Sequence, residues 1–273
     1  MGIARRGWPL WLTDDEIYRI PIRENNSVKR GREGNMDSLR MPGSSTLPMS
    51  SDAAAERITA FLRKVYGWMG VGLAITAAVA LQVAESPTVM RYLFANQFLF
   101  LGLILAELGL VFFLSARAAR LAPSTATALF VTYAALNGVT LSFVLLAYTG
   151  ESVASTFVVT AGMFGAMALF GSTTKRSLAG FGQFLYMGLI GLVLASLVGI
   201  FWHNDALQFV ISAVGVLVFT GLAAWDAQRM KQMALAVPEG QAGSFAIVGA
   251  LALYLDFINL FLFLLSFLGG RRE

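Results

Sequence analysis

The sequence predicts an all-α polytopic membrane protein with seven transmembrane helices. Of its 273 residues, 57% are hydrophobic and only 13% are charged, and the mean hydropathy is +0.68. Soluble domains, by contrast, are about 45–50% apolar and about 25% charged. The apolar residues also gather into runs of about twenty, the length that crosses a hydrocarbon layer of ~30 Å at 1.5 Å per residue.

The first sixty residues differ from the rest of the chain. They are rich in Arg, Ser, Pro and acidic residues and contain no apolar stretch of spanning length. They also lack the hydrophobic region that follows the basic residues of a secretory signal peptide. We therefore expect residues 1–60 to form a disordered cytosolic tail. The alternative is a natural translation start at Met36, Met41 or Met49.

Residues 61–273 are predicted to form one transmembrane domain. Short polar turns separate the apolar runs, so sequential helices should be neighbours in a bundle. Residues 52–64 can form an amphipathic helix that leads into the first span, with Ser51 or Asp52 as its N-cap. The seven expected spans are residues 65–83, 98–115, 124–148, 153–171, 181–202, 207–225 and 245–268.

Basic residues accompany every second connection, which predicts the orientation of the chain. By the positive-inside rule these connections face the cytosol, and so does the N-terminus. The basic residues are Arg57, Arg63 and Lys64, then Arg117 and Arg120, then Lys175 and Arg176, and finally Arg229 and Lys231. The intervening connections carry Glu85 and Arg91, then Glu151, then His203 and Asp205.

The C-terminal segment is in tension with this rule. Seven crossings place Arg271 and Arg272 outside, although basic residues favour the cytosolic side. The last segment therefore either crosses despite its basic end or is re-entrant and returns to the cytosol. Non-helical backbone at membrane depth is tolerated only inside protein, so we expect the segment to cross.

The composition also bounds the chemistry. The chain has no cysteine and one histidine, His203, which excludes disulfide and thiolate chemistry and argues against a zinc or di-iron site. It has no serine–lysine or paired-aspartate GxGD motif, and we expect neither an enzyme nor a cofactor. The sequence pI of about 9.6 follows from basic cytosolic loops and requires no nucleic-acid partner.

Three carboxylates lie within or at the end of predicted spans. Asp256 interrupts the apolar run 246–268 near its middle, Glu107 lies midway along the second span, and Asp226 ends the sixth. A charged side chain at the bilayer centre costs ~2.5–3.5 kcal/mol on insertion scales, so a chain that keeps one usually uses it. For Asp226 the sequence also allows a simpler interpretation, an ordinary carboxylate at the cytosolic boundary.

Other polar residues can join these carboxylates. Asn259 is one helical turn beyond Asp256 and shares its face, where it can donate to the carboxylate or help to bind a cation. Tyr254 faces elsewhere and is expected to serve packing. Asn137 and Thr140 add oxygen atoms in the third span. Oxygen ligands suit protons or hard cations such as Ca²⁺.

Several long segments resemble the bacterial, YccA-like branch of the Bax inhibitor-1 family, the transmembrane Bax-inhibitor-motif proteins. The resemblance covers residues 63–268, and the motifs occur in the family's order. The segments are ELGLVFFLS (107–115), YAALNGVTLSFV (133–144), FGSTTKRSLAGFGQFLYMGLIGL (170–192), FTGLAAWDAQRMKQM (219–233) and LALYLDFINLFLFLL (251–265).

The resemblance implies a seven-helix fold whose last helix is central. It also implies a pH-sensitive Ca²⁺ leak governed by aspartates of the sixth and seventh helices, which map onto Asp226 and Asp256. A basic residue that latches the sixth-helix aspartate maps onto Arg117, with Arg120 as the second choice. Trp225 stands where the family usually has Tyr. Counting residues along the spans puts the two aspartates at different depths, so their pairing is implied by the resemblance alone.

We therefore expect a pH-gated calcium (cation) leak channel in a bacterial inner membrane, with the lipid bilayer, calcium ions and protons as its partners. In this hypothesis Asp226 and Asp256 form the proton sensor, the cation path and the calcium ligands. Arg117 acts as the latch, and Glu107 and Asn259 are supporting polar groups. The alternative is a non-conducting membrane regulator, or a substrate of a membrane-anchored AAA protease, with the N-terminal tail as its handle.

Overall fold

The computed structural model describes residues 50–273 apart from residues 203, 271 and 273. The expectations for residues 1–49, including the three possible start methionines, and those for His203 and Arg271 lie outside the described residues. The chain divides into two units, Met1–Glu56 and Arg57–Glu273. The second unit contains the helix bundle, and the boundary lies four residues before the expected one at residue 60.

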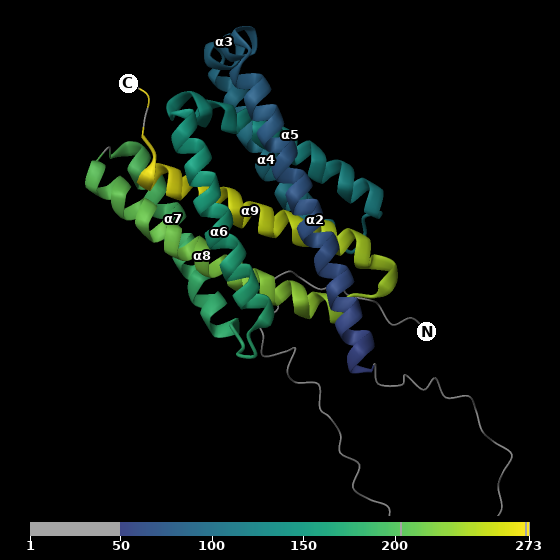
Figure 1. The fold of residues 1–273 in the computed structure, drawn as a ribbon. Coiled ribbons are helices and arrows are strands. Elements are labelled where there is room, and N and C mark those ends of the chain that lie inside the picture. The colour runs from purple at the N-terminus through teal and green to yellow at the C-terminus, as the bar shows by residue number, and fades with distance from the viewer. Residues whose placement is uncertain (1–49, 203, 271, 273) are drawn as a thin grey trace, which may run out of the picture. The chain divides into compact units, whose positions relative to one another are not determined.

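The described residues fold into α-helices joined by short connections, as the sequence predicts (Figure 1). Seven of the helices are long and apolar enough to span a membrane, so the chain is a multi-pass membrane protein. The elements are α2 (Ser51–Ala84), α3 (Pro87–Ala95), α4 (Gln97–Arg117), α5 (Pro123–Ala147), α6 (Gly150–Thr173), α7 (Ala179–Phe201), α8 (Asp205–Ala236), the 3₁₀ turn η1 (Glu239–Gln241) and α9 (Ala242–Leu268).

The first helix begins earlier than a hydropathy profile suggests. The predicted amphipathic stretch and the first span form one continuous helix of 34 residues, so residues 51–60 are helical and the expectation of disorder does not hold there. Its N-cap is Ser50, whose Oγ accepts a hydrogen bond from the backbone N–H of Ala53 at 3.2 Å. Capping by this hydroxyl satisfies one of the free N–H groups at the helix start.

Two further differences from the predicted spans have local causes. Helix α8 continues to Ala236, eleven residues beyond the predicted end of its span, because backbone hydrogen bonds do not stop where the side chains become polar.

The short helix α3 was not predicted from the sequence. Pro87 starts it and the Ser86 side chain caps it, and both are typical of a helix N-terminus.

Helix α9 lies at the centre of the bundle, in agreement with the expected fold (Figure 1). In its most apolar window 67% of the residues are buried, compared with 11–44% in the other spans. It packs against α4, α5, α6 and α8, and its Tyr254 contacts Thr76 of α2. Helix α7 packs against α8, and α8 connects it to the centre.

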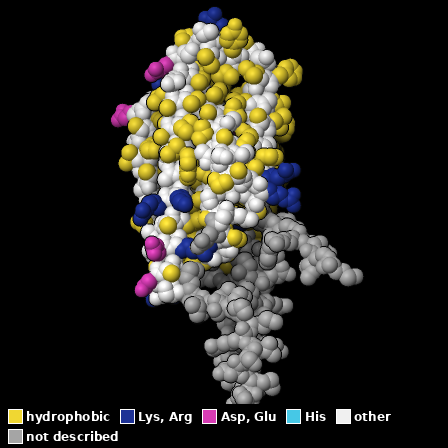
Figure 2. Space-filling model, turned by 90° about the vertical axis from the view of Figure 1, so that its right-hand side faces the viewer, with side chains coloured by type: hydrophobic (Ala, Val, Ile, Leu, Met, Phe, Trp, Pro, Cys, Tyr) yellow, Lys and Arg dark blue, Asp and Glu magenta, His cyan; other side chains and the backbone are white. Residues whose placement is uncertain are grey.

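The outer surface of the bundle is apolar, as contact with lipid requires. Large hydrophobic side chains such as Phe98, Phe112 and Phe201 are 72–89% exposed. On the face in Figure 2, hydrophobic side chains cover the middle band, whereas Lys, Arg, Asp and Glu gather toward its two ends. This distribution matches helices whose middle sections lie in hydrocarbon and whose ends reach water.

The C-terminal residues are hydrogen-bonded to the connection between α5 and α6. The N–H of Thr149 donates to the carbonyl of Gly270 at 3.2 Å, and the N–H of Arg272 donates to the carbonyl of Ala147 at 3.0 Å. The N–H of Gly270 also donates to Ser152 Oγ at 2.9 Å. Helix α9 is one continuous helix of 27 residues that runs from one end of the bundle to the other, and its crossing of the membrane stays a prediction.

Helices α6 and α8 approach each other closely at Gly171. A Cβ atom on Gly171 would lie 1.9 Å from the carbonyl oxygen of Ala224, which leaves no room for any other residue type. Small residues allow such close backbone approach, which drives helix packing in lipid. The contact holds α6 against the turn of α8 that precedes Asp226.

Candidate functional site

The structure brings the two aspartates of the predicted pair together. The side chains of Asp226 on α8 and Asp256 on α9 lie next to each other, and the two residues are only 7% and 6% exposed. We call these two residues the aspartate pair. Two buried carboxyl groups this close cannot both be ionised cheaply, so the arrangement suits a pair that shares one proton.

The two carboxyl groups are at similar depth because α8 is longer than its predicted span. Asp226 lies ten residues before the end of α8, and Asp256 lies fourteen residues after the start of α9. At 1.5 Å per residue these positions are about 15 Å and about 21 Å from the connection that joins the two antiparallel helices. The depth mismatch expected from the sequence came from ending the sixth span at residue 225.

Each aspartate also keeps one oxygen without a hydrogen-bond partner. Among the described residues, the buried side-chain atoms without a partner are Asp226 Oδ1, Asp256 Oδ2 and Thr220 Oγ1. Unpaired buried oxygens are rare because each loses its hydration without replacement. Two of them on facing carboxyl groups form a place where a proton, a water molecule or a cation can bind.

The guanidinium closest to the pair belongs to Arg229, one turn further along α8. Its Nη1 lies 3.9 Å from Asp226 Oδ1, close enough for charge attraction but too far for a hydrogen bond. The guanidinium also lies 5.5 Å from the ring centroid of Trp225, and Tyr186 of α7 packs edge-to-face on the same indole. The i, i+3 spacing of Asp226 and Arg229 is the sequence signal that predicts this contact.

Arg117, the residue assigned as the latch, is not placed at Asp226. Its guanidinium lies 5.5 Å from the ring centroid of Phe113 on its own helix. Helix α4 packs mainly against α5, with smaller contacts to α3 and α9. Arg120, the second choice, is an exposed residue just beyond α4. In this structure Arg229 therefore occupies the position expected for the latch.

Gln228 is a site residue that the sequence reasoning missed. Its buried amide accepts a hydrogen bond from the N–H of Leu178 and donates one to the carbonyl of Arg176, both at 2.8 Å. These bonds attach the connection between α6 and α7 to α8, two residues from Asp226. The sequence does contain a signal for Gln228, because it is a polar side chain two positions after the aspartate in the motif WDAQRMK.

The supporting polar residues divide into two groups. The Nδ2 of Asn259 donates to the carbonyl of Leu255 in its own helix at 2.8 Å and not to the aspartate pair. Glu107 lies elsewhere and accepts a hydrogen bond from Thr140 at 2.5 Å. Tyr254 faces away from Asp256, as expected, but it is hydrogen-bonded as well as packed.

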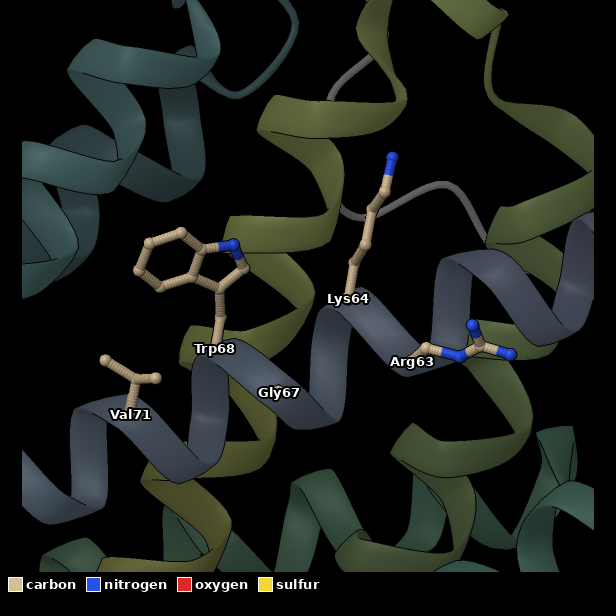
Figure 3. Close-up of a pocket in the computed structure, with 5 residues that line it drawn as sticks. All are labelled: Arg63, Lys64, Gly67, Trp68 and Val71. Atoms are coloured by element: carbon tan, nitrogen blue, oxygen red, sulfur yellow. The ribbon is translucent and has the colours of Figure 1, made fainter.

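A shallow depression of about 240 Å³ lies on the outer face of α2. Figure 3 shows Lys64, Trp68 and Val71 extending from the same side of the helix, with Gly67 between them and Arg63 beside them. A basic residue, then an indole, then an aliphatic residue along one helix face is typical of the boundary between water and hydrocarbon. The depression contains no carboxylate and is not part of the aspartate pair.

The pair offers too few ligands for tight metal binding. Calcium takes six to eight oxygen ligands. Within the part of the chain that the structure describes, no three His, Cys, Asp or Glu side chains come together. Two carboxyl groups at the contact of two helices suit a cation that binds briefly and keeps most of its water.

Comparison with known proteins agrees with this architecture. Residues 58–273 match the family model described as inhibitor of apoptosis-promoting Bax1. The inner membrane protein YbhL of Escherichia coli K12 is 51% identical over 215 residues, which is 78% of this chain and 92% of the relative. An uncharacterized protein of Caulobacter vibrioides is 44% identical over 236 residues, or 82% and 93% of the two chains. The family match covers every helix that forms the pair, and this chain belongs to the Bax inhibitor-1 family.

Proposed function

We propose that this protein is a pH-sensitive leak channel for calcium or similar cations in the inner membrane of a bacterium, with its N-terminus in the cytosol. The aspartate pair acts as the proton sensor and forms part of the cation path. The observation that carries the proposal is the close approach of two buried carboxyl groups on neighbouring membrane helices. The inner-membrane location is supported by the Escherichia coli relative, which is named an inner membrane protein.

In this proposal the charge of the aspartate pair controls whether the channel conducts. With one proton, Asp226 and Asp256 attract each other and hold α8 against α9. Without a proton, two negative charges in a low-dielectric interior repel each other or recruit a cation. Conduction should therefore increase as the pH rises through the titration of the pair. Arg229 favours the ionised form, because its positive charge faces Asp226.

The ligands that the site offers support the passage of a cation and not catalysis. The pair supplies two carboxyl groups, which attract a hard cation without enclosing it. We propose no catalytic reaction and no cofactor, and as partners only the lipid bilayer, protons and calcium. A latch role for Arg117 requires a second state in which the end of α4 approaches Asp226.

The test is calcium flux into proteoliposomes that contain an internal calcium indicator, measured over a range of pH. Asp256→Asn should give low flux at every pH, because the amide can still donate a hydrogen bond to Asp226 but cannot ionise. Glu151→Gln serves as the control, since Glu151 is an exposed carboxylate in the first turn of α6. Wild-type flux and pH profile in Asp256→Asn would contradict the proposal. An absence of flux in the wild type would favour the non-conducting regulator.

A further inference from the structure

The shallow depression on the outer face of α2 combines two positive charges with an apolar wall. Arg63 and Lys64 lie at one end of it and are exposed, and Gly67, Trp68 and Val71 line the rest. A Cβ atom on Gly67 would meet no atom within 4 Å, so the middle of the depression is open. In Figure 3, Lys64 and Trp68 extend to the same side of the helix, with Gly67 between them. The depression is therefore accessible to a molecule that borders α2.

The positive charges of Arg63 and Lys64 have no recorded counter-charge among the described residues. The ion pair in that part of the chain joins Asp226 to Arg229, and no recorded hydrogen bond there involves the side chain of Arg63 or Lys64. The residues one helical turn away from them on α2 are uncharged: Thr59, Ala60, Phe61, Tyr66, Gly67 and Trp68. Two adjacent positive charges are thus left for a partner outside the described part of the chain.

Arg57 shows at which end of the bundle the depression lies. Its guanidinium donates to the carbonyl of Val237, the residue that caps the C-terminal end of α8. This contact places the start of α2 beside the connection between α8 and α9. Arg63 and Lys64 follow Arg57 within about two helical turns. The two charges therefore lie toward the end of the bundle that the proposed orientation assigns to the cytosol.

The apolar part of the depression indicates which kind of anion fits. From Lys64 to Val71 the depression follows α2 for seven residues, about 10 Å at 1.5 Å per residue. Trp68 and Val71 lie nearer the middle of this helix than the two charges, and Val71 is 45% exposed. A free anion would contact the charged end alone. A molecule with an anionic head and an apolar chain would contact both ends, as an anionic phospholipid does.

We propose that this depression is a binding site for an anionic phospholipid, in the cytosolic leaflet if the proposed orientation is correct. Arg63 and Lys64 bind the negatively charged headgroup, and Trp68 and Val71 contact the glycerol region and the upper part of an acyl chain. Basic and aromatic residues at a membrane boundary contact lipids of any charge. The property that distinguishes this site is a preference for a negative headgroup, and it does not depend on ion conduction.

The number of charges sets the size of the expected preference. A basic residue near an anionic membrane surface contributes an attraction that corresponds to a roughly fivefold change in affinity. Arg63 and Lys64 together should therefore favour an anionic over a zwitterionic lipid by roughly 25-fold at most. Replacing both residues with glutamine should remove this preference and leave the apolar contacts of the depression in place.

The direct test is quenching of Trp68 fluorescence by lipids with brominated acyl chains, which quench an indole on contact. The full-length protein is reconstituted in phosphatidylcholine that contains equal mole fractions of either brominated phosphatidylglycerol or brominated phosphatidylcholine. The Trp68 signal is the difference between each protein and the same protein with Trp68→Phe. Brominated phosphatidylglycerol should quench this signal more strongly. Equal quenching by the two brominated lipids overturns the proposal.

Two double variants separate this site from general attraction to a basic protein. Arg63→Gln with Lys64→Gln should make the two brominated lipids equally effective. Lys175→Gln with Arg176→Gln removes the same charge from two exposed residues of another connection and should keep the preference. Equal loss in both double variants would show that net charge alone attracts the lipid, and it would overturn the proposal.

A free anion is the other source of the same chemistry, and inorganic phosphate distinguishes it from a lipid. Added phosphate should leave the quenching by brominated phosphatidylglycerol unchanged. Relief of quenching by phosphate would assign the depression to a small soluble anion and overturn the lipid assignment.

Native mass spectrometry keeps the test decisive if Trp68→Phe does not fold. The detergent-solubilised protein is given equal amounts of phosphatidylglycerol and phosphatidylcholine, and the retained lipids are counted by mass. The wild type and the Lys175/Arg176 double variant should retain more phosphatidylglycerol than the Arg63/Lys64 double variant does. Equal retention in all three proteins overturns the proposal, whatever the outcome of the flux experiment.

Discussion

Tyr254 and Asp256 lie two residues apart on α9 and belong to different polar clusters on opposite sides of that helix. Tyr254 hydrogen-bonds to α2 and α5, whereas Asp256 lies beside Asp226 on α8. Two positions along an α-helix correspond to a rotation of roughly half a turn, which accounts for the opposite directions. Because the helix is rigid, any movement of α9 that separates the aspartate pair also strains the hydrogen bonds of Tyr254.

We expect the hydroxyl of Tyr254 to contribute to stability. Tyr254→Phe keeps the edge-to-face contacts with Phe130 and Tyr133 but leaves Thr76 and Asn137 without their shared partner. An unsatisfied buried polar group costs about 1–3 kcal/mol. A protein of this size loses roughly 2–4 °C in Tm for each kcal/mol.

Thermal unfolding in detergent measures this effect. Tyr92→Phe is the matched control, because Tyr92 is 70% exposed. The control should unfold at the wild-type temperature. Equal Tm values for the two variants would show that the Tyr254 hydroxyl contributes no net stability.

Arg229 should set the pH at which conduction begins, more than Arg117 does. Removing the guanidinium in Arg229→Gln makes the ionised pair less favourable, so half-maximal flux should require a higher pH. A partly exposed ion pair contributes about 0.2–1 kcal/mol. Since 1.36 kcal/mol corresponds to one pH unit, the shift should be less than about one unit.

Arg117→Gln provides the comparison for the same flux measurement. Its guanidinium lies over Phe113 and not at Asp226. We therefore expect its pH profile to stay near that of the wild type. A larger shift in Arg117→Gln than in Arg229→Gln would restore Arg117 as the latch.

The sequence predicts the membrane fold well because its signals are local. Runs of apolar residues at spanning length and short turns identify all seven long helices. The resemblance adds the central position of α9 and the pairing of Asp226 with Asp256. Each of these features depends on a continuous segment or on a motif of several adjacent residues.

What the sequence did not predict depends on contacts between distant segments. Tyr254 was assigned to packing, because its position does not reveal its partners on other helices. Arg229 was interpreted only as a topology signal, although its spacing from Asp226 on the same helix was available in the sequence. Gln228 bonds to the backbone of residues 176 and 178, about fifty positions away. The length of α8 was missed for a different reason: hydropathy reports where side chains become polar, not where a helix ends.

Gly171 should tolerate no larger residue. In Gly171→Ala the new Cβ would lie 1.9 Å from the carbonyl oxygen of Ala224, so α6 and α8 must move apart. Overpacking of this kind costs about 1–3 kcal/mol. The Tm of the variant should fall accordingly.

Gly165→Ala on the same helix is the matched control. A Cβ at Gly165 would meet no atom within 4 Å. Alanine is also the better helix former by about 1 kcal/mol, so this variant should be as stable as the wild type or more stable. If both alanine variants lowered the Tm equally, the close approach of α6 and α8 at Gly171 would not be the cause.

The crossing of α9 makes a prediction about the two sides of the membrane. The chain contains no cysteine, so a single introduced thiol reports its own position. Arg272→Cys should react with a membrane-impermeant maleimide from the outside, because residue 272 is bonded to the connection between α5 and α6. Gly240→Cys, in the connection between α8 and α9, should react only from the cytosolic side.

Two reference positions calibrate this labelling experiment. Glu85→Cys, between α2 and α3, should behave like Arg272→Cys, and Lys175→Cys, between α6 and α7, should behave like Gly240→Cys. Labelling of residues 240 and 272 from the same side would contradict a last helix that crosses. Labelling of residue 175 from the outside would instead reverse the proposed orientation of the N-terminus and leave the crossing intact.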